Sequence, residues 1–82
     1  MAKSPEDASA MKLVRTEFGR RLVDTSQADI RVLHGLCTVR GVLKPMRGGP
    51  TDMKTEVETI AKVLRQRNGI RDVIMEVTLR SG

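Results

Sequence analysis

Several residue types are scarce or missing in this chain of 82 residues. It contains no Trp and no Tyr, one Phe (Phe18), one cysteine (Cys37) and one histidine (His34). A single cysteine cannot form a disulfide within the chain, so the covalent staple of small secreted domains is missing. The core must be built from aliphatic side chains, and a core of this size rarely contributes more than about 3–5 kcal/mol. We therefore expect one small domain that is stabilised further by a homodimer or a protein partner.

Long apolar runs and targeting signals are also missing. The chain opens with MAKSPEDASA, in which Lys3, Glu6 and Asp7 are charged, and no apolar run follows. A membrane-spanning helix needs about 20 apolar residues, and a secretory signal needs an apolar segment behind its basic start. We therefore predict no transmembrane segment and a cytoplasmic location.

The sequence carries no motif for catalysis or for metal binding. A metal site needs several His, Cys or carboxylate ligands that converge, and Asp24 and Asp29 lie near His34 without a ligand spacing. Cys37 follows His34 by three positions, and strand residues three apart point to opposite faces. We therefore expect Cys37 to be a core thiol and His34 to be a solvated turn residue. The prediction is a protein that is not an enzyme, with no catalytic residue, no metal site and no cofactor.

Charge of both signs is present, with an excess of basic residues. Fifteen Lys and Arg stand against ten Asp and Glu, which gives a net charge of +5. Such a balance suits anionic partners such as nucleic acid or lipid head groups. The basic residues are spread along the chain and no run exceeds two, at Arg20-Arg21. Interaction tails have longer blocks of like charge, so a soluble surface is the simpler explanation.

The stretch IRVLHGLCTVRGVL, from Ile30 to Leu43, predicts a β-hairpin with a tight turn at His34-Gly35. The second half alternates with a period of two, which places one set of residues on the covered face of a strand. That set is Cys37, Val39, Gly41 and Leu43. Gly41 inside a strand predicts a bulge or the close approach of another segment.

A first amphipathic helix is predicted before the hairpin. Ser4-Pro5-Glu6-Asp7 supplies a cap, a proline at the first helical position and two acids at the positive end of the helix dipole. The apolar stripe consists of Met11, Val14, Phe18 and Leu22. Glu17 and Arg21 fall off this stripe, and Gly19 either weakens the helix or lets it approach the sheet closely. The polar stretch Asp24-Thr25-Ser26-Gln27 is predicted to end the helix.

A second amphipathic helix is predicted from Met53 to Arg67, capped by Thr51 or Asp52. Its apolar stripe consists of Met53, Val57, Ile60, Ala61 and Leu64. Glu58 and Lys62 form an i,i+4 pair in the favourable order.

A last strand follows Ile70, and its covered face carries Val73, Met75, Val77 and Leu79. The order helix–strand–strand–helix–strand predicts an α+β fold, a two-layer αββαβ sandwich. Its three-stranded mixed sheet carries two helices on one face. We expect residues 1–10 to be an N-terminal segment that is frayed or forms the first helical turn, and residues 11–82 to form a single domain.

These residues resemble the BON domain, a small bacterial αββαβ module. The family carries an apolar strand, a glycine turn, and alternating apolar residues with a second glycine six positions on. The matching residues here are Ile30-Arg31-Val32, Gly35, Cys37, Val39 and Gly41, and the step into the last strand is Gly69-Ile70-Arg71-Asp72-Val73. The resemblance implies a non-enzymatic binding module, because BON domains are associated with binding phospholipid, membranes or other ligands.

Two regions are predicted as binding sites. In the loop before the second helix, Lys44, Arg47, Gly48 and Gly49 lie together, and glycine-rich loops at helix N-termini present N–H groups to anions. On the strands, Arg31, Arg40 and Arg80 are out of phase with the covered positions and are predicted on an open sheet face. Leu36, Val42 and Ile74 are predicted beside them. A face of this kind suits an anion or a dimer interface.

We therefore predict a binding module that engages a protein partner, itself, or an anionic lipid or ligand. It uses the open sheet face and the loop of residues 44–51. The alternative is a nucleic-acid-binding protein that uses distributed Lys and Arg contacts to phosphates. Sheets that bind nucleic acid add stacking aromatic residues, and this chain offers none on its predicted strands, so we place nucleic acid second.

Overall fold

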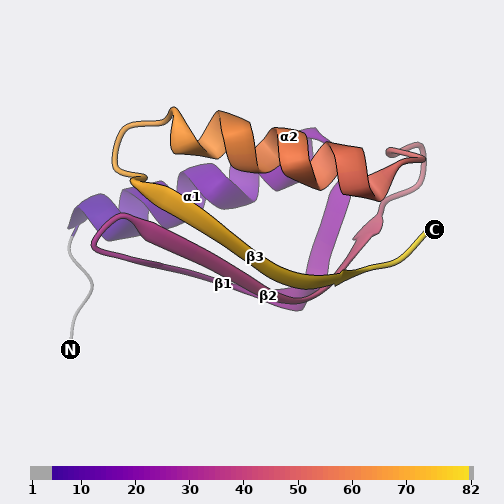
Figure 1. Cartoon of the computed structure of the whole chain (residues 1–82), viewed down its shortest axis with the longest axis horizontal. Helices are drawn as coiled ribbons and strands as arrows, with labels where there is room; N and C mark the ends of the chain where they lie inside the picture. Colours follow the sequence, from indigo (N-terminus) through magenta and orange to yellow (C-terminus); the bar gives the residue numbers. More distant parts are fainter. Residues whose placement is uncertain (1–4, 82) are drawn as a thin grey trace.

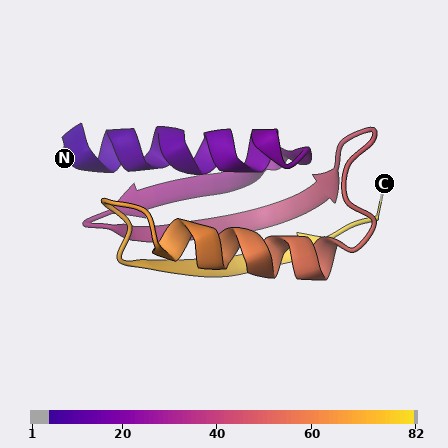
Figure 2. The same cartoon turned by 90° about the horizontal axis from the view of Figure 1, so that it is seen from above.

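The computed structural model describes residues 5–81. Its elements are α1 (Pro5–Arg20), β1 (Val23–Leu33), β2 (Leu36–Pro45), α2 (Met53–Arg65) and β3 (Asp72–Leu79). Both helices lie on the same side of one three-stranded sheet, as Figure 1 shows from the side and Figure 2 from above. The predicted α+β fold and its element order are therefore confirmed. The predicted cap at Ser4 lies outside the described residues.

The sheet is mixed, with β2 in the middle. β1 and β2 pair antiparallel, and β2 and β3 pair parallel from Leu36↔Asp72 to Leu43↔Leu79. The hairpin turn lies at the predicted position. His34 and Gly35 have φ values of 51° and 82°, and two residues of positive φ are what a tight hairpin turn requires.

The start of β1 differs from the sequence prediction. Asp24 to Gln27 does not end a helix but belongs to β1, and Leu22 lies beyond α1 with an exposed side chain. The pairing with β2 shifts register between Asp24 and Gln27. Gly41 lies opposite this shift, and a Cβ atom there would be 2.5 Å from the carbonyl oxygen of Gln27. The polar stretch is thus tolerated in a strand because it forms an irregular, solvated pairing.

The core lies between the helices and the sheet. Its completely buried side chains come from α1, β1, β2 and α2, and include Phe18, Val32, Val39, Ile60 and Leu64. The predicted stripe of α2 is buried as expected. In α1, Val14 and Phe18 are buried and Met11 packs beside them.

Well-defined local interactions mark the start of α2. The Asp52 side chain accepts a hydrogen bond from the backbone N–H of Thr55 at 3.1 Å, so Asp52 rather than Thr51 is the cap. The helix ends at Arg65, two residues before the predicted end.

Candidate functional site

The side of the sheet that faces away from the helices is the candidate site, and we call it the open face. Along each strand its residues alternate with buried ones such as Ile30, Val32, Cys37, Val39 and Val73. The open face consists of Asp29, Arg31, Leu33, Leu36, Thr38, Arg40, Val42, Ile74, Glu76 and Thr78. Both helices lie on the other side of the sheet, and no other described helix or strand lies on this side, as Figure 1 shows.

The structure brings the predicted arginines of the strands to the open face and pairs them with acids. Arg31 Nε lies 2.8 Å from Asp29 Oδ2, and Arg40 Nε lies 2.9 Å from Glu76 Oε1. The register places Arg40 directly between Asp29 on β1 and Glu76 on β3. Two arginines therefore meet two acids, and the centre of the face is close to neutral. The prediction that these arginines point outward is correct, but their positive charge is largely balanced.

Arg80 lies apart from the other two arginines. It follows the end of β3, its side chain is exposed, and its backbone N–H donates to the carbonyl oxygen of Leu43 at 2.9 Å. It therefore borders the open face at the end of the sheet farthest from the hairpin turn.

An exposed apolar cluster occupies the hairpin end of the open face. Leu33 is 58% exposed, Leu36 is 41% exposed and Ile74 is 40% exposed. Leu33 pairs directly with Leu36, and Thr38 pairs with Ile74 on the other side. A shallow hollow between Arg31, Leu33, Leu36 and Arg40 joins this apolar cluster to the charged row. Leu33 was missed in the sequence prediction, although its position two residues after Arg31 placed it in phase with this face.

The predicted loop residues lie together at the opposite end of the molecule, beside two acids. Lys44 Nζ is 3.8 Å from Asp24 Oδ2. Arg47 and Gly48 are exposed, and Gly49 packs against the backbone of Leu22.

The acids near this loop have lowered pKa values. The pKa of Asp24 is lowered mainly by a hydrogen bond from the backbone N–H of Ser26, and that of Asp52 mainly by the side chain of Thr55. The carboxylate of Asp52 already occupies the N-terminus of α2, where an external anion would be attracted.

Asp7 is an important residue that the sequence prediction placed only at a helix dipole. It is buried, and its carboxylate accepts hydrogen bonds from the backbone N–H groups of His34 at 3.0 Å and Gly35 at 3.3 Å. It thereby ties the start of α1 to the hairpin turn beside the apolar cluster. No sequence spacing signals this contact, because the partners are far apart in the chain.

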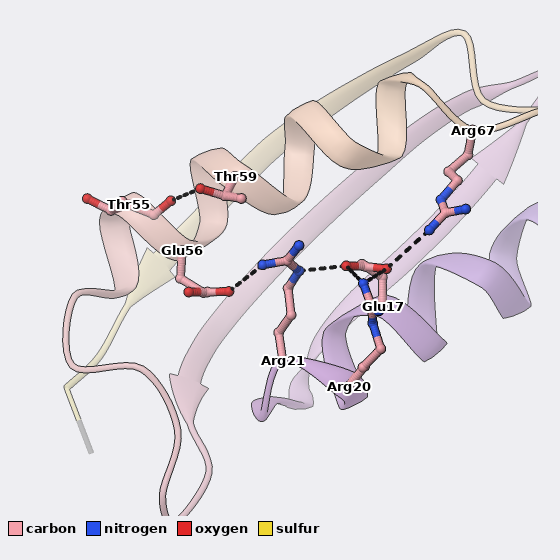
Figure 3. Close-up of polar contacts among 7 residues, drawn as sticks. All are labelled: Glu17, Arg20, Arg21, Thr55, Glu56, Thr59 and Arg67. Carbon is pink, nitrogen blue, oxygen red and sulfur yellow. Dashed lines mark hydrogen bonds and ion pairs between the residues drawn. The ribbon is translucent and has the colours of Figure 1, made fainter.

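A second buried acid, Glu17, joins the two helices and is shown in Figure 3. Its carboxylate accepts hydrogen bonds from Arg20 and Arg21 and lies 3.9 Å from Arg67 Nη2. Arg21 also donates to Glu56 Oε2 of α2 at 3.0 Å. The pKa of Glu17 is lowered, chiefly by the hydrogen bond from Arg21, while burial opposes this effect. Glu17 was predicted off the apolar stripe, and it is buried because arginine side chains cover it.

Cys37 and His34 lie in different environments, one in the core and the other in solvent. Cys37 is completely buried, and burial raises the pKa of its thiol to about 11. His34 is exposed at the turn. Within residues 5–81, no group of three or more His, Cys, Asp or Glu side chains is arranged to hold a metal ion. None of the helices in that range is long and apolar enough to cross a membrane.

Comparison with protein-family models and with curated proteins gives no match. Among solved structures, the chain is similar to CdsD, a structural protein of the type III secretion system of Chlamydia trachomatis. The TM-score is 0.69 at 16% sequence identity, and the match covers 93% of this chain and 32% of that chain. This chain therefore spans about a third of the length of the CdsD chain that it matches. At this identity the similarity establishes a shared αββαβ fold.

Proposed function

We propose that this domain is a non-enzymatic protein-interaction module with a BON-like fold, and that it binds a protein partner through the open face. The observation that carries the proposal is the exposed cluster of Leu33, Leu36 and Ile74 beside arginines that are already paired with acids. The centres of protein interfaces are apolar and poor in unpaired charge, with polar groups at the rim.

The balance of charge on the open face favours a protein over an anionic ligand. Asp29 and Glu76 would repel the phosphates that Arg31 and Arg40 attract. Binding to single-stranded nucleic acid relies on aromatic stacking and a basic groove, and the open face has neither. The similarity to CdsD, itself a structural protein of a secretion system, supports a role in protein assembly. Because a lone buried cysteine suits a reducing compartment, the proposal includes a cytoplasmic location.

A site-specific photo-crosslinker in the native cell tests this function. Placed at Leu36, it should give a discrete covalent adduct with a protein. Placed at Arg15, an exposed position on α1, it should give none and serves as the matched control. Equal adducts from both positions would contradict a role for the open face.

Salt separates the proposal from the nucleic-acid alternative. Binding through phosphate contacts falls steeply between about 50 and 200 mM salt, whereas an apolar interface changes little. When the crosslinking is repeated in cell lysate, we expect the yield of the Leu36 adduct to be nearly constant over this range of salt. Loss of the adduct with salt or with nuclease would favour nucleic acid instead.

A further inference from the structure

The outer edge of β3 presents a row of outward backbone groups from Met75 to Leu79. The N–H group of Arg80 donates to the carbonyl oxygen of Leu43 at 2.9 Å, and that of Asp72 lies 3.5 Å from the carbonyl oxygen of Gly35, which Arg71, ahead of the strand, also contacts. Within β3, the even-numbered residues therefore face β2. Odd-numbered residues therefore face outward, because the backbone alternates along a strand. The outward groups of Val73 are bound by Asp72 Oδ1 and by Arg65 Nη2. For the outward N–H and C=O groups of Met75, Val77 and Leu79, no residue within the described part of the chain is a hydrogen-bond partner.

The helices leave this edge accessible and protect the opposite one. Seen from above in Figure 2, α1 overhangs the β1 side of the sheet, whereas β3 runs along the outer border of α2. The inward side chains of β1, Ile30 and Val32, are buried, but those of Met75, Val77 and Leu79 in β3 are only partly buried. β1 is also interrupted by its register shift, while the pairing of β3 is regular. Bulges are one means by which proteins block an edge strand, and β3 has none.

A groove continues from this edge beneath α2. It is lined by the apolar side chains of Val57, Ala61, Val73 and Met75 together with the charged side chains of Glu58, Lys62 and Arg65. An added strand would place alternate side chains in this groove and extend the core. The free backbone groups and the apolar side chains of the groove together fit another extended segment, as in strand addition to a sheet edge.

The charges on the outer flank of α2 fit a second copy of this chain. Lys54, Glu58 and Lys62 follow one another at a spacing of four, which places them on one side of the helix. All three side chains are exposed, and among the ion pairs of the described residues none joins Glu58 to Lys62, the pair that the sequence predicted. A second copy of α2 can lie antiparallel beside this flank in two alignments. Glu58 of each helix is then opposite either Lys54 or Lys62 of the other helix.

We propose that the chain forms a symmetric dimer in which β3 pairs antiparallel with β3 of a second copy, centred on Val77. In this register Met75 lies opposite Leu79 of the second copy, and the outward groups of three residue pairs exchange about six backbone hydrogen bonds. Glu76 lies opposite Thr78 of the second copy, so no like charges meet. The two sheets form one six-stranded sheet with an isologous interface. This dimer is independent of the partner that binds the open face.

The backbone part of the proposal is tested by Val77→Pro with Val77→Ala as its control. Proline removes the outward N–H of residue 77 but no hydrogen bond to β2, and edge strands tolerate it. Sedimentation equilibrium should show a dimer for the natural chain and for Val77→Ala, and a monomer for Val77→Pro. In the natural chain, amide exchange at Met75, Val77 and Leu79 should slow as concentration rises. Exchange that is independent of concentration at these amides would overturn the proposal.

The helix flank is tested by charge reversal, which does not depend on the proline variant folding. Glu58→Lys should weaken the dimer by about tenfold, because two exposed ion pairs are replaced by repulsion. Inverting all three charges, with Lys54→Glu, Glu58→Lys and Lys62→Glu together, should restore it. A dimer that is insensitive to these changes but is lost in Leu36→Arg would place the contact on the open face and refute the β3 assignment. A strictly monomeric natural chain would also refute it.

Discussion

Cys37 shows at the scale of one residue how burial determines reactivity. Its thiol is completely buried, and its pKa is raised to about 11 by that burial. The thiolate is the reactive form, so iodoacetamide should label native protein very slowly at pH 8. Labelling should reach the rate of a free thiol once denaturant is added. Rapid labelling of the native protein would show that Cys37 is accessible.

At Gly41, both the backbone conformation and the space available are unfavourable for any residue that has a Cβ atom. Its φ is 108°, and a Cβ atom would lie 2.5 Å from the carbonyl oxygen of Gln27. We expect Gly41→Ala to lower the free energy of unfolding by about 1–3 kcal/mol, as measured by urea denaturation.

Gly19→Ala is the matched control for Gly41→Ala. Gly19 lies in α1, and a Cβ atom there would meet nothing within 4 Å. Alanine should therefore raise the free energy of unfolding by about 0.5–1 kcal/mol. Equal effects at the two glycines would contradict the close approach of Gln27 to Gly41. The open space at Gly19 also shows that this glycine does not serve a close approach to the sheet.

At the scale of elements, Glu17 links α1 to α2 through arginines. Its folded pKa is lowered, so on acidification the unfolded chain takes up the proton first. The stabilisation is fully present above the unfolded pKa of about 4.3 and is lost as pH falls through the lower folded value. At pH 7, Glu17→Gln should reduce the free energy of unfolding by about 1–2 kcal/mol.

The pH dependence distinguishes this role of Glu17 from packing alone. In urea denaturation between pH 7 and pH 3, the difference between Glu17→Gln and the natural chain should narrow below about pH 4.3. Glu76→Gln removes an exposed ion pair with Arg40 and should change the profile little. A difference that is constant over the whole range would show that the charge of Glu17 is not responsible.

The elements with clear periodicity were predictable from the sequence, and those held by distant contacts were not. The stripe of α2 and the alternation of β3 follow from hydrophobic spacing. The local propensity of Asp24 to Gln27 indicated the end of a helix. In the structure these residues belong to β1, which begins at Val23, because they pair with β2 around Gly41. The open-face arginines were predictable in direction but not in charge, because Asp29 and Glu76 reach them only through the sheet register.

At the scale of the whole molecule, the open face and the core share the same strands but differ in their contribution to stability. Leu36→Ser should change the free energy of unfolding by less than about 1 kcal/mol, because Leu36 is 41% exposed. Val39→Ser places a hydroxyl in the core and should cost more than about 2 kcal/mol. Urea denaturation measures both, and crosslinking from Ile74 should be lost in Leu36→Ser. A large stability loss in Leu36→Ser would show that the apolar cluster serves the fold instead.

The domain is thin, with a shortest dimension of 18 Å, and the sheet has only one protected side. A partner bound to the open face therefore contacts the same strand, β2, that carries the buried core residues Cys37 and Val39 on its other face. A partner that binds only the folded domain stabilises it by mass action. At a free concentration of 100 times its Kd, such a partner raises the free energy of unfolding by about 2.7 kcal/mol. A rise in melting temperature would thus report occupancy without any label, which turns the thermal stability of the domain into an assay for its unknown binder.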